Sequence, residues 1–211
     1  MGCGCLGSSD PNAQLIQQAC AGKNEEQKKV IEYFLKSEGC LSKNITDDEY
    51  LSLVYKKRDS LNLKQKALSK IGLDEDELQE IPPIMFEGFT FKNAWSKRKA
   101  NGNWVSSAYQ VSWLFFSATE VYIYQYTMNM DEDKKSESTE EYFYRDVTSF
   151  NTRTETEIAK DNSGNKIEVE SNKFAIIVPG ATLCVALDDT TGDFEAAIQG
   201  MKQKLREKKM Q

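Results

Sequence analysis

The spacing of apolar side chains divides the chain into two parts. Before residue 82 the apolar residues recur every three or four positions, which is the period of amphipathic helices. After residue 83 they tend to alternate with polar residues, which is the period of β-strands. Pro82 and Pro83 stand at the change, and two adjacent prolines cannot continue a helix. We therefore place a domain boundary at this pair.

Three helices are predicted before the boundary. Asn24 with Gln27, and Thr46 with Glu49, have the spacing of capping boxes at the start of a helix. Gly72 is expected to end the third helix, because glycine favours the left-handed conformation found there. The expected inner faces hold the apolar residues Val30, Ile31, Phe34, Leu35, Tyr50, Leu53, Val54, Leu61, Leu63, Ala67, Leu68 and Ile71. Residues 23–81 are thus a helical segment, and residues 1–22 are expected to be flexible or to form a short helix.

Roughly seven antiparallel strands are predicted after the boundary. They are predicted within residues 84–91, 104–116, 120–128, 142–158, 166–178 and 181–187. A corner near Arg145 and Asp146 divides the range 142–158. The polar run of residues 129–141 is expected to be a mobile loop. Such short strands joined by short turns are typical of a sandwich or a small barrel.

The C-terminal segment predicts an amphipathic helix. Phe194, Ile198, Met201 and Leu205 form its apolar stripe. Acidic residues lie in its first turn and basic residues near its end, which complements the helix dipole. The fold class is therefore α+β: an N-terminal helical segment, then a seven-stranded antiparallel bent sheet or barrel that the last helix caps.

The hairpin of residues 111–127 is unusually rich in aromatic side chains. We expect one core face made of Val111, Trp113, Phe115, Val121 and Ile123, and an opposite face made of Tyr122, Tyr124 and Tyr126. Helices or neighbouring strands would cover the tyrosines in one interpretation. In the other they form an exposed stripe that binds a partner, since tyrosine joins an apolar ring to a polar tip.

Composition narrows the classes of function. The chain has 211 residues, a formal net charge of −6 and no histidine. The charge argues against a nucleic-acid binder, which usually carries a basic face. The lack of histidine removes histidine-based catalytic triads and metal sites, and we expect no cofactor and no metal. No stretch of about 18 apolar residues and no secretory signal is visible, so a cytoplasmic location is expected.

Residues 84–209 resemble the pleckstrin-homology (PH)-like superfamily, which includes bacterial PH and GRAM families. The resemblance rests on "WLFFSATEVYIYQYT", followed by "EEYFYRDVTSF", and on a terminal amphipathic helix after the strands. It implies a bent antiparallel sheet that presents loops to a ligand. In members that bind phosphoinositides, the loop after the first strand carries basic residues. The matching loop here contains Lys92, Trp95, Lys97, Arg98 and Lys99, which makes it a candidate site for anionic lipid or phosphate.

Two shorter resemblances concern the N-terminal part. Residues 45–61 are similar to SHOCT, a short helical oligomerisation module, through Ile45, Thr46, Glu49, Tyr50, Lys56 and Lys57. The opening "MGCGCLGSS" resembles the start of dual-acylated kinases, which implies Gly2, Cys3 and Cys5 as acylation positions. Leu6 departs from that pattern, because serine or threonine is preferred at its position.

Three hypotheses of function follow. The first is a non-enzymatic binding or scaffold module, with a protein partner or self-association through the helical segment. The second is a peripheral protein on the inner face of the membrane that binds anionic lipid through the basic loop. The third is an enzyme of unrecognised type, for which no convergent nucleophile and base can be named.

Overall fold

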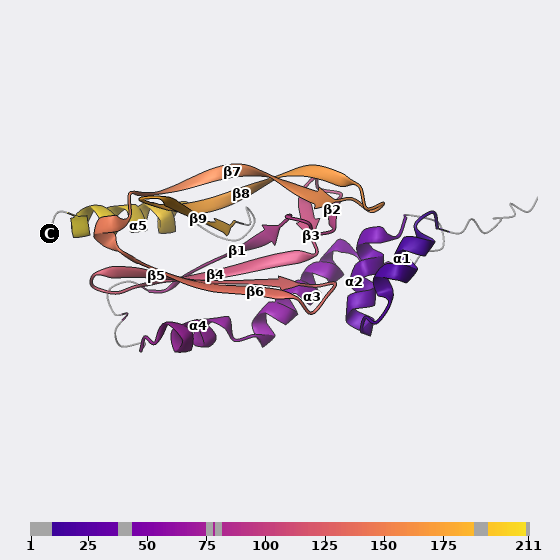
Figure 1. Cartoon of the computed structure of the whole chain (residues 1–211), viewed down its shortest axis with the longest axis horizontal. Coiled ribbons are helices and arrows are strands. Elements are labelled where there is room, and N and C mark those ends of the chain that lie inside the picture. The colour runs from indigo at the N-terminus through magenta and orange to yellow at the C-terminus, as the bar shows by residue number, and fades with distance from the viewer. Residues whose placement is uncertain (1–9, 38–43, 75–77, 79–81, 188–193, 210–211) are drawn as a thin grey trace, which may run out of the picture.

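The computed structural model describes residues 10–37, 44–74, 78, 82–187 and 194–209 (Figure 1). Helices lie in the N-terminal part and at the C-terminus, and antiparallel sheets lie between them. The expected α+β class is therefore confirmed.

The predicted helix signals act as expected. The Asn24 side chain accepts from the Gln27 N–H at 2.9 Å, and Thr46 accepts from the Glu49 N–H at 3.2 Å, so both capping boxes form. Gly72 ends its helix with φ at 78°, which suits a residue without a Cβ. The helices are α1 (Ala13–Cys20), α2 (Glu25–Leu35), α3 (Asp47–Ser60), α4 (Leu63–Ile71) and α5 (Phe194–Lys209).

The strands form two main sheets and a small hairpin. The first sheet has the order β1-β4-β5-β6 and the second has the order β7-β8-β9, while β2 pairs only with β3. Their bounds are β1 Ile84–Thr90, β2 Ser96–Arg98, β3 Trp104–Ser106, β4 Ala108–Phe116, β5 Glu120–Asn129, β6 Lys135–Phe143, β7 Ser149–Lys160, β8 Lys166–Val178 and β9 Ala181–Ala186. Among the described residues the two sheets do not close into a barrel, so the barrel alternative is not observed.

Two details of the strand prediction are corrected. The polar run expected to be a mobile loop contains most of β6, which pairs with β5 along its whole length. Its polar sequence suits an edge strand, where charged side chains face solvent. The long strand predicted for residues 104–116 is interrupted at Ser107, whose backbone N–H donates to Trp95 and whose carbonyl accepts from Met130. The part before Ser107 pairs with β2 instead of the main sheet.

The faces of the aromatic hairpin are also corrected. Leu114 pairs with Ile123 and Phe116 with Val121, so these four residues share one face. Trp113 pairs with Tyr124. The expected grouping of Val111, Trp113 and Phe115 with Val121 and Ile123 is therefore wrong by one residue, and such a shift moves every side chain to the other face of a strand.

Each face of the first sheet is buried by a different layer (Figure 1). One face packs on the second sheet and α5 through a core that includes Phe86, Leu114, Phe116, Val121, Ile123, Phe150, Phe174, Ile176, Val185, Ile198 and Met201. The other packs on the N-terminal helices through a core that includes Val30, Phe34, Tyr50, Val54, Leu63, Ala67, Leu68, Tyr109, Val111, Phe115, Tyr124 and Tyr126. The concentration of aromatic residues in the hairpin is thus explained by a strand pair that is packed on both faces.

An ion pair also joins the helical layer to the sheet. Arg58 on α3 donates through Nη1 to both carboxylate oxygens of Glu87 on β1, at 2.6 and 2.9 Å. The Glu87 side chain is only 6% exposed, so little water competes for these bonds. A buried carboxylate of this kind depends on its cation for stability.

Candidate functional site

The β2–β3 hairpin projects from the end of the sheets that lies opposite α5 (Figure 1). Its turn is tight: Lys99 donates its backbone N–H to the carbonyl of Asn103 at 2.8 Å, and Gly102 has φ at 90°. The Arg98 Nε atom donates to the Gly102 carbonyl at 2.8 Å, which holds the guanidinium against the turn. The hairpin therefore presents defined side chains.

The five residues of the predicted basic loop do not share one surface. Lys92 is exposed, and Trp95 is half-buried against the helical core, with the Lys160 ammonium 5.3 Å from its ring centroid. Lys97 places its ammonium 4.7 Å from the ring centroid of Tyr33 on α2. Lys97 and Arg98 line a hollow, whereas Lys92, Trp95 and Lys99 are not part of its lining.

We name this first cavity the basic hollow. It has a volume of about 330 Å³ and is lined by Phe34, Lys36, Ser37, Ser96, Lys97, Arg98, Trp104, Asp161, Asn162 and Ile167. These residues come from the end of α2, from the hairpin and from the β7–β8 turn with the start of β8. Three basic residues and one carboxylate thus line the same space, although the Lys36 ammonium also lies 3.8 Å from Glu32. The excess of positive charge favours an anionic ligand.

Two polar groups of the basic hollow define its chemistry further. Ser96 is 4% exposed, and its hydroxyl oxygen has no hydrogen-bond partner within the described part of the chain. Burial disfavours the charged form of Asp161, but bonds from the backbone N–H and side chain of Asn165, and from the Ser163 N–H, outweigh it and lower the pKa of Asp161. The Asp161 charge is therefore satisfied by its own turn, while the buried Ser96 hydroxyl has no partner among the described residues.

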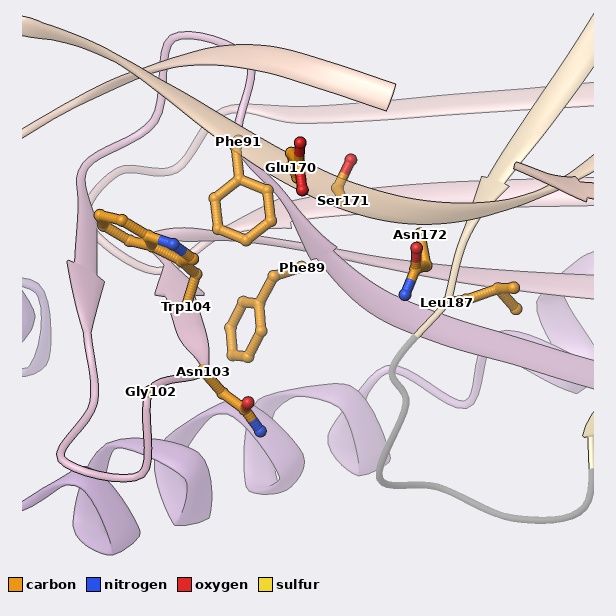
Figure 2. A pocket seen from close by; sticks show the side chains of 9 residues that line it. All are labelled: Phe89, Phe91, Gly102, Asn103, Trp104, Glu170, Ser171, Asn172 and Leu187. Carbon is orange, nitrogen blue, oxygen red and sulfur yellow. The ribbon is translucent and has the colours of Figure 1, made fainter. Parts of the chain in front are cut away.

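A second cavity shares Trp104 with the basic hollow, and we name it the aromatic hollow (Figure 2). It has a volume of about 200 Å³. Figure 2 shows the three rings of its lining gathered together, with the polar side chains of β8 along the other wall. The lining consists of Phe89, Phe91, Gly102, Asn103, Trp104, Glu170, Ser171, Asn172 and Leu187.

Neither hollow was visible as a unit in the sequence. Lys36, Ser96 and Asp161 are far apart along the chain, and no spacing rule connects a helix end with a strand and a turn. The signals that existed were local: a basic hairpin, and the turn-forming run "DNSGN" that supplies Asp161 and Asn162. The Lys160 backbone N–H donates to the Ala94 carbonyl at 2.8 Å, which places the start of this turn beside the hairpin.

The tyrosine stripe is covered from within the chain. Tyr124 is fully buried, Tyr126 is 5% exposed and Tyr122 is half-buried. The Lys66 ammonium on α4 lies 4.6 Å from the ring centroid of Tyr126. The structure therefore shows the first of the two expected arrangements, in which the N-terminal helices cover the tyrosines.

A charged cluster fixes α4 over this stripe. Glu137 on β6 accepts from the Tyr124 hydroxyl at 2.6 Å and from the ammonium groups of Lys66 and Lys70 at 2.9 and 3.1 Å. Burial opposes ionisation of Glu137, but these bonds outweigh it and lower its pKa from 4.5 to about 2. A lowered pKa contributes stability that is complete above the unfolded value and is lost as the pH falls through the folded one.

We expect Glu137→Gln to lower the free energy of unfolding by about 2 kcal/mol near neutral pH, because hydrogen bonds to a charged group are lost. The difference from the parent should shrink as the pH falls from 4.5 towards about 2, where the parent carboxylate becomes protonated. Urea unfolding at about pH 7 and about pH 3 measures it. Glu141→Gln on the same strand is the control, since Glu141 is exposed. Equal losses at both pH values would contradict the role of this cluster.

Other expectations concern the N-terminus, metals and the membrane. Gly2, Cys3 and Cys5 lie outside the described residues. Within the described residues, no group of three or more cysteine, aspartate or glutamate side chains is arranged to hold a metal ion. No helix in the described part of the chain is long and apolar enough to cross a membrane.

Comparisons with known proteins add no assignment. No protein-family model matches the chain, no curated protein matches it, and no solved structure matches it. The function must therefore be argued from the geometry of the described residues.

Proposed function

We propose that the chain is a non-enzymatic binding module of PH-like architecture, which binds a ligand with an anionic group in the basic hollow. The observation that carries the proposal is that Lys36, Lys97 and Arg98 line one cavity together with Ser96, whose buried hydroxyl has no partner among the described residues. Arginine offers a planar fork and lysine a point charge, and both suit phosphate oxygens. A phosphate-bearing lipid head group is the class of ligand that we favour.

The order of the strands supports the PH-like part of the proposal. Without the β2–β3 hairpin, seven strands follow one another as a four-stranded and a three-stranded antiparallel sheet. The terminal helix packs on the core between these sheets through Ile198 and Met201. The hairpin then occupies the loop between the first and second main strands, which is the loop that carries basic residues in the phosphoinositide-binding members of that superfamily.

The helical segment has a different place in this proposal. The SHOCT-like residues 45–61 contain α3, and its buried residues Tyr50 and Val54 pack on the first sheet of the same chain. Tyr50 also donates to the Ser106 carbonyl at 2.5 Å. The first sheet thus covers the α3 face that carries these two residues. We therefore propose that α3 docks on the sheet of its own chain and does not mediate self-association.

Charge reversal tests the basic hollow. Lys97→Glu with Arg98→Glu should weaken binding to phosphatidylglycerol vesicles more than tenfold, because each cation near an anionic surface contributes about 1 kcal/mol. Lys92→Glu with Lys99→Glu changes the net charge by the same amount on the same loop but leaves the lining intact. We expect this control pair to lose only a few-fold. Vesicle co-sedimentation at low and high salt measures both.

The same experiment separates the alternatives. Equal losses in both double variants would indicate general surface attraction and overturn the hollow as the site. Absence of parent binding at low salt would overturn the anionic ligand and leave a protein partner as the occupant to seek. Titration with inorganic phosphate, followed by the amide resonance of Ser96, shows whether the phosphate group alone is recognised.

A further inference from the structure

The aromatic hollow lies where the two sheets leave an open seam. In the described strands, β1 pairs only with β4, and β9 pairs with β8 only from Lys173 to Val178. The first half of β8 therefore has one edge without a strand partner in the described structure. Phe89 and Phe91, at the end of β1, face this edge across the hollow (Figure 2).

The rings of the hollow are held in place by the core behind them. Phe89 stacks on Tyr50 with ring centroids 6.3 Å apart and meets the Tyr109 ring edge-on at 5.0 Å. Phe91 is 4% exposed and packs in a small core with Trp104, Ala159 and Val169. Rings that are already ordered lose little entropy when a ligand binds between them.

One carboxylate in the wall has no ion-pair partner in the described part of the chain. Ser171 and Lys173, further along β8, both contact Glu157, at 2.7 and 2.9 Å. Glu170 forms no ion pair with any described residue, and no lysine or arginine belongs to the lining of the aromatic hollow. The lining of the hollow thus combines three aromatic side chains with one negative charge, and its charge is opposite to that of the basic hollow.

We propose that the aromatic hollow binds a methylated ammonium group, such as the head group of choline. A cation placed against aromatic faces is attracted by their quadrupoles, and a quaternary ammonium has methyl groups that also bury apolar surface. A bare ammonium is strongly hydrated and would lose more water on entry. The volume of about 200 Å³ admits a head group of this size and not a large ligand. The two hollows share Trp104, but the charged side chains that line them are different, so each proposal has its own charge variants.

Titration with tetramethylammonium and with choline tests the proposal. Sodium chloride holds the ionic strength constant, and the amide resonances of Glu170 and Asn172 and the indole N–H of Trp104 report on binding. We expect saturable shifts with dissociation constants of about millimolar size. The neutral isostere 3,3-dimethylbutanol should bind about tenfold more weakly, because it has the shape of choline without the charge.

Two glutamates of β8 provide a matched pair of variants. Glu170→Gln should weaken choline binding about three- to tenfold, whereas Glu168→Gln, which removes the same charge two residues away and outside the lining, should leave it unchanged. Both residues are exposed, so both variants should fold. Trp104→Leu should abolish binding and Trp104→Phe should retain part of it.

Two titrations, one with free choline and one with a phosphatidylcholine, distinguish a small-molecule ligand from a lipid head group. Binding of free choline supports a small-molecule ligand, and binding of dihexanoylphosphatidylcholine but not of free choline supports a lipid head group. Absence of saturable shifts in both arms would overturn the proposal. Equal affinity for 3,3-dimethylbutanol, or equal effects of Glu168→Gln and Glu170→Gln, would also overturn it. Phosphatidylglycerol contains no ammonium group, so this result is separable from the test of the basic hollow.

Discussion

Ile198→Asp is expected to unfold the β-domain. Ile198 is 5% exposed and packs in the core between the two sheets, beside Met201. An aspartate there would lose apolar burial and place an unpaired carboxylate among aromatic and aliphatic side chains. The expected loss exceeds about 4 kcal/mol, which is a large part of the roughly 5–15 kcal/mol that stabilises a typical domain. Thermal melting followed by near-ultraviolet circular dichroism measures it.

Gln199→Asp is the matched control for this variant. It introduces the same residue and the same charge at the next position of α5, where the side chain is exposed. We expect its melting temperature to stay within a few degrees of the parent. If Ile198→Asp melts like this control, α5 does not contribute to the core. Phe194 and Leu205 belong to the same predicted stripe, but their side chains lie outside the described ones.

Arg58→Met is expected to destabilise the contact between the helical layer and the sheet. Glu87 would keep its place on β1, 6% exposed, without the cation that donates to both of its oxygens. Breaking a buried pair from one side costs about 3–5 kcal/mol, because a desolvated charge is left behind. Urea unfolding should show this loss, and hydrogen exchange should show faster opening of α3 and α4 than of the second sheet.

A double-mutant cycle isolates this interaction. Adding Glu87→Gln to Arg58→Met removes the stranded charge, so we expect the double variant to recover more than half of the loss. Lys28→Met is an external control, because the Lys28–Glu25 pair is exposed and should contribute less than about 1 kcal/mol. A double variant as unstable as Arg58→Met would show that the guanidinium acts through packing and not through the charge of Glu87.

The local signals in the sequence were sufficient for most of the elements. Asn24 and Thr46 begin helices because their side chains satisfy backbone N–H groups a few residues away, and Gly72 ends one because of its own backbone freedom. The change of period at Pro82 is also a local signal, because the spacing of apolar residues within a short window distinguishes a helix from a strand. Each of these interactions spans a few residues, so it can be recognised without knowledge of the fold.

The candidate site could be predicted only in part. Lys97 and Arg98 were expected as a basic loop, and they do line the basic hollow. Lys36 and Ser96 were not expected there, and neither was the grouping of Phe89 with Glu170 in the aromatic hollow. Each hollow is made by elements that pair or pack at long range, and the sequence contains no signal for which turn meets which hairpin.

The sequence by itself determined the α+β class, the helix ends and the aromatic hairpin of residues 111–127. Only the tertiary structure decided which face of that hairpin is which. An alternating pattern identifies the buried face of a strand when the other face is polar. Here both faces of the hairpin carry apolar and aromatic side chains, so the pattern does not show which face is which. The faces became distinct because α4 covers one and the second sheet covers the other. The same packing placed the tyrosines inside the molecule and left the β2–β3 hairpin as the surface that carries both hollows.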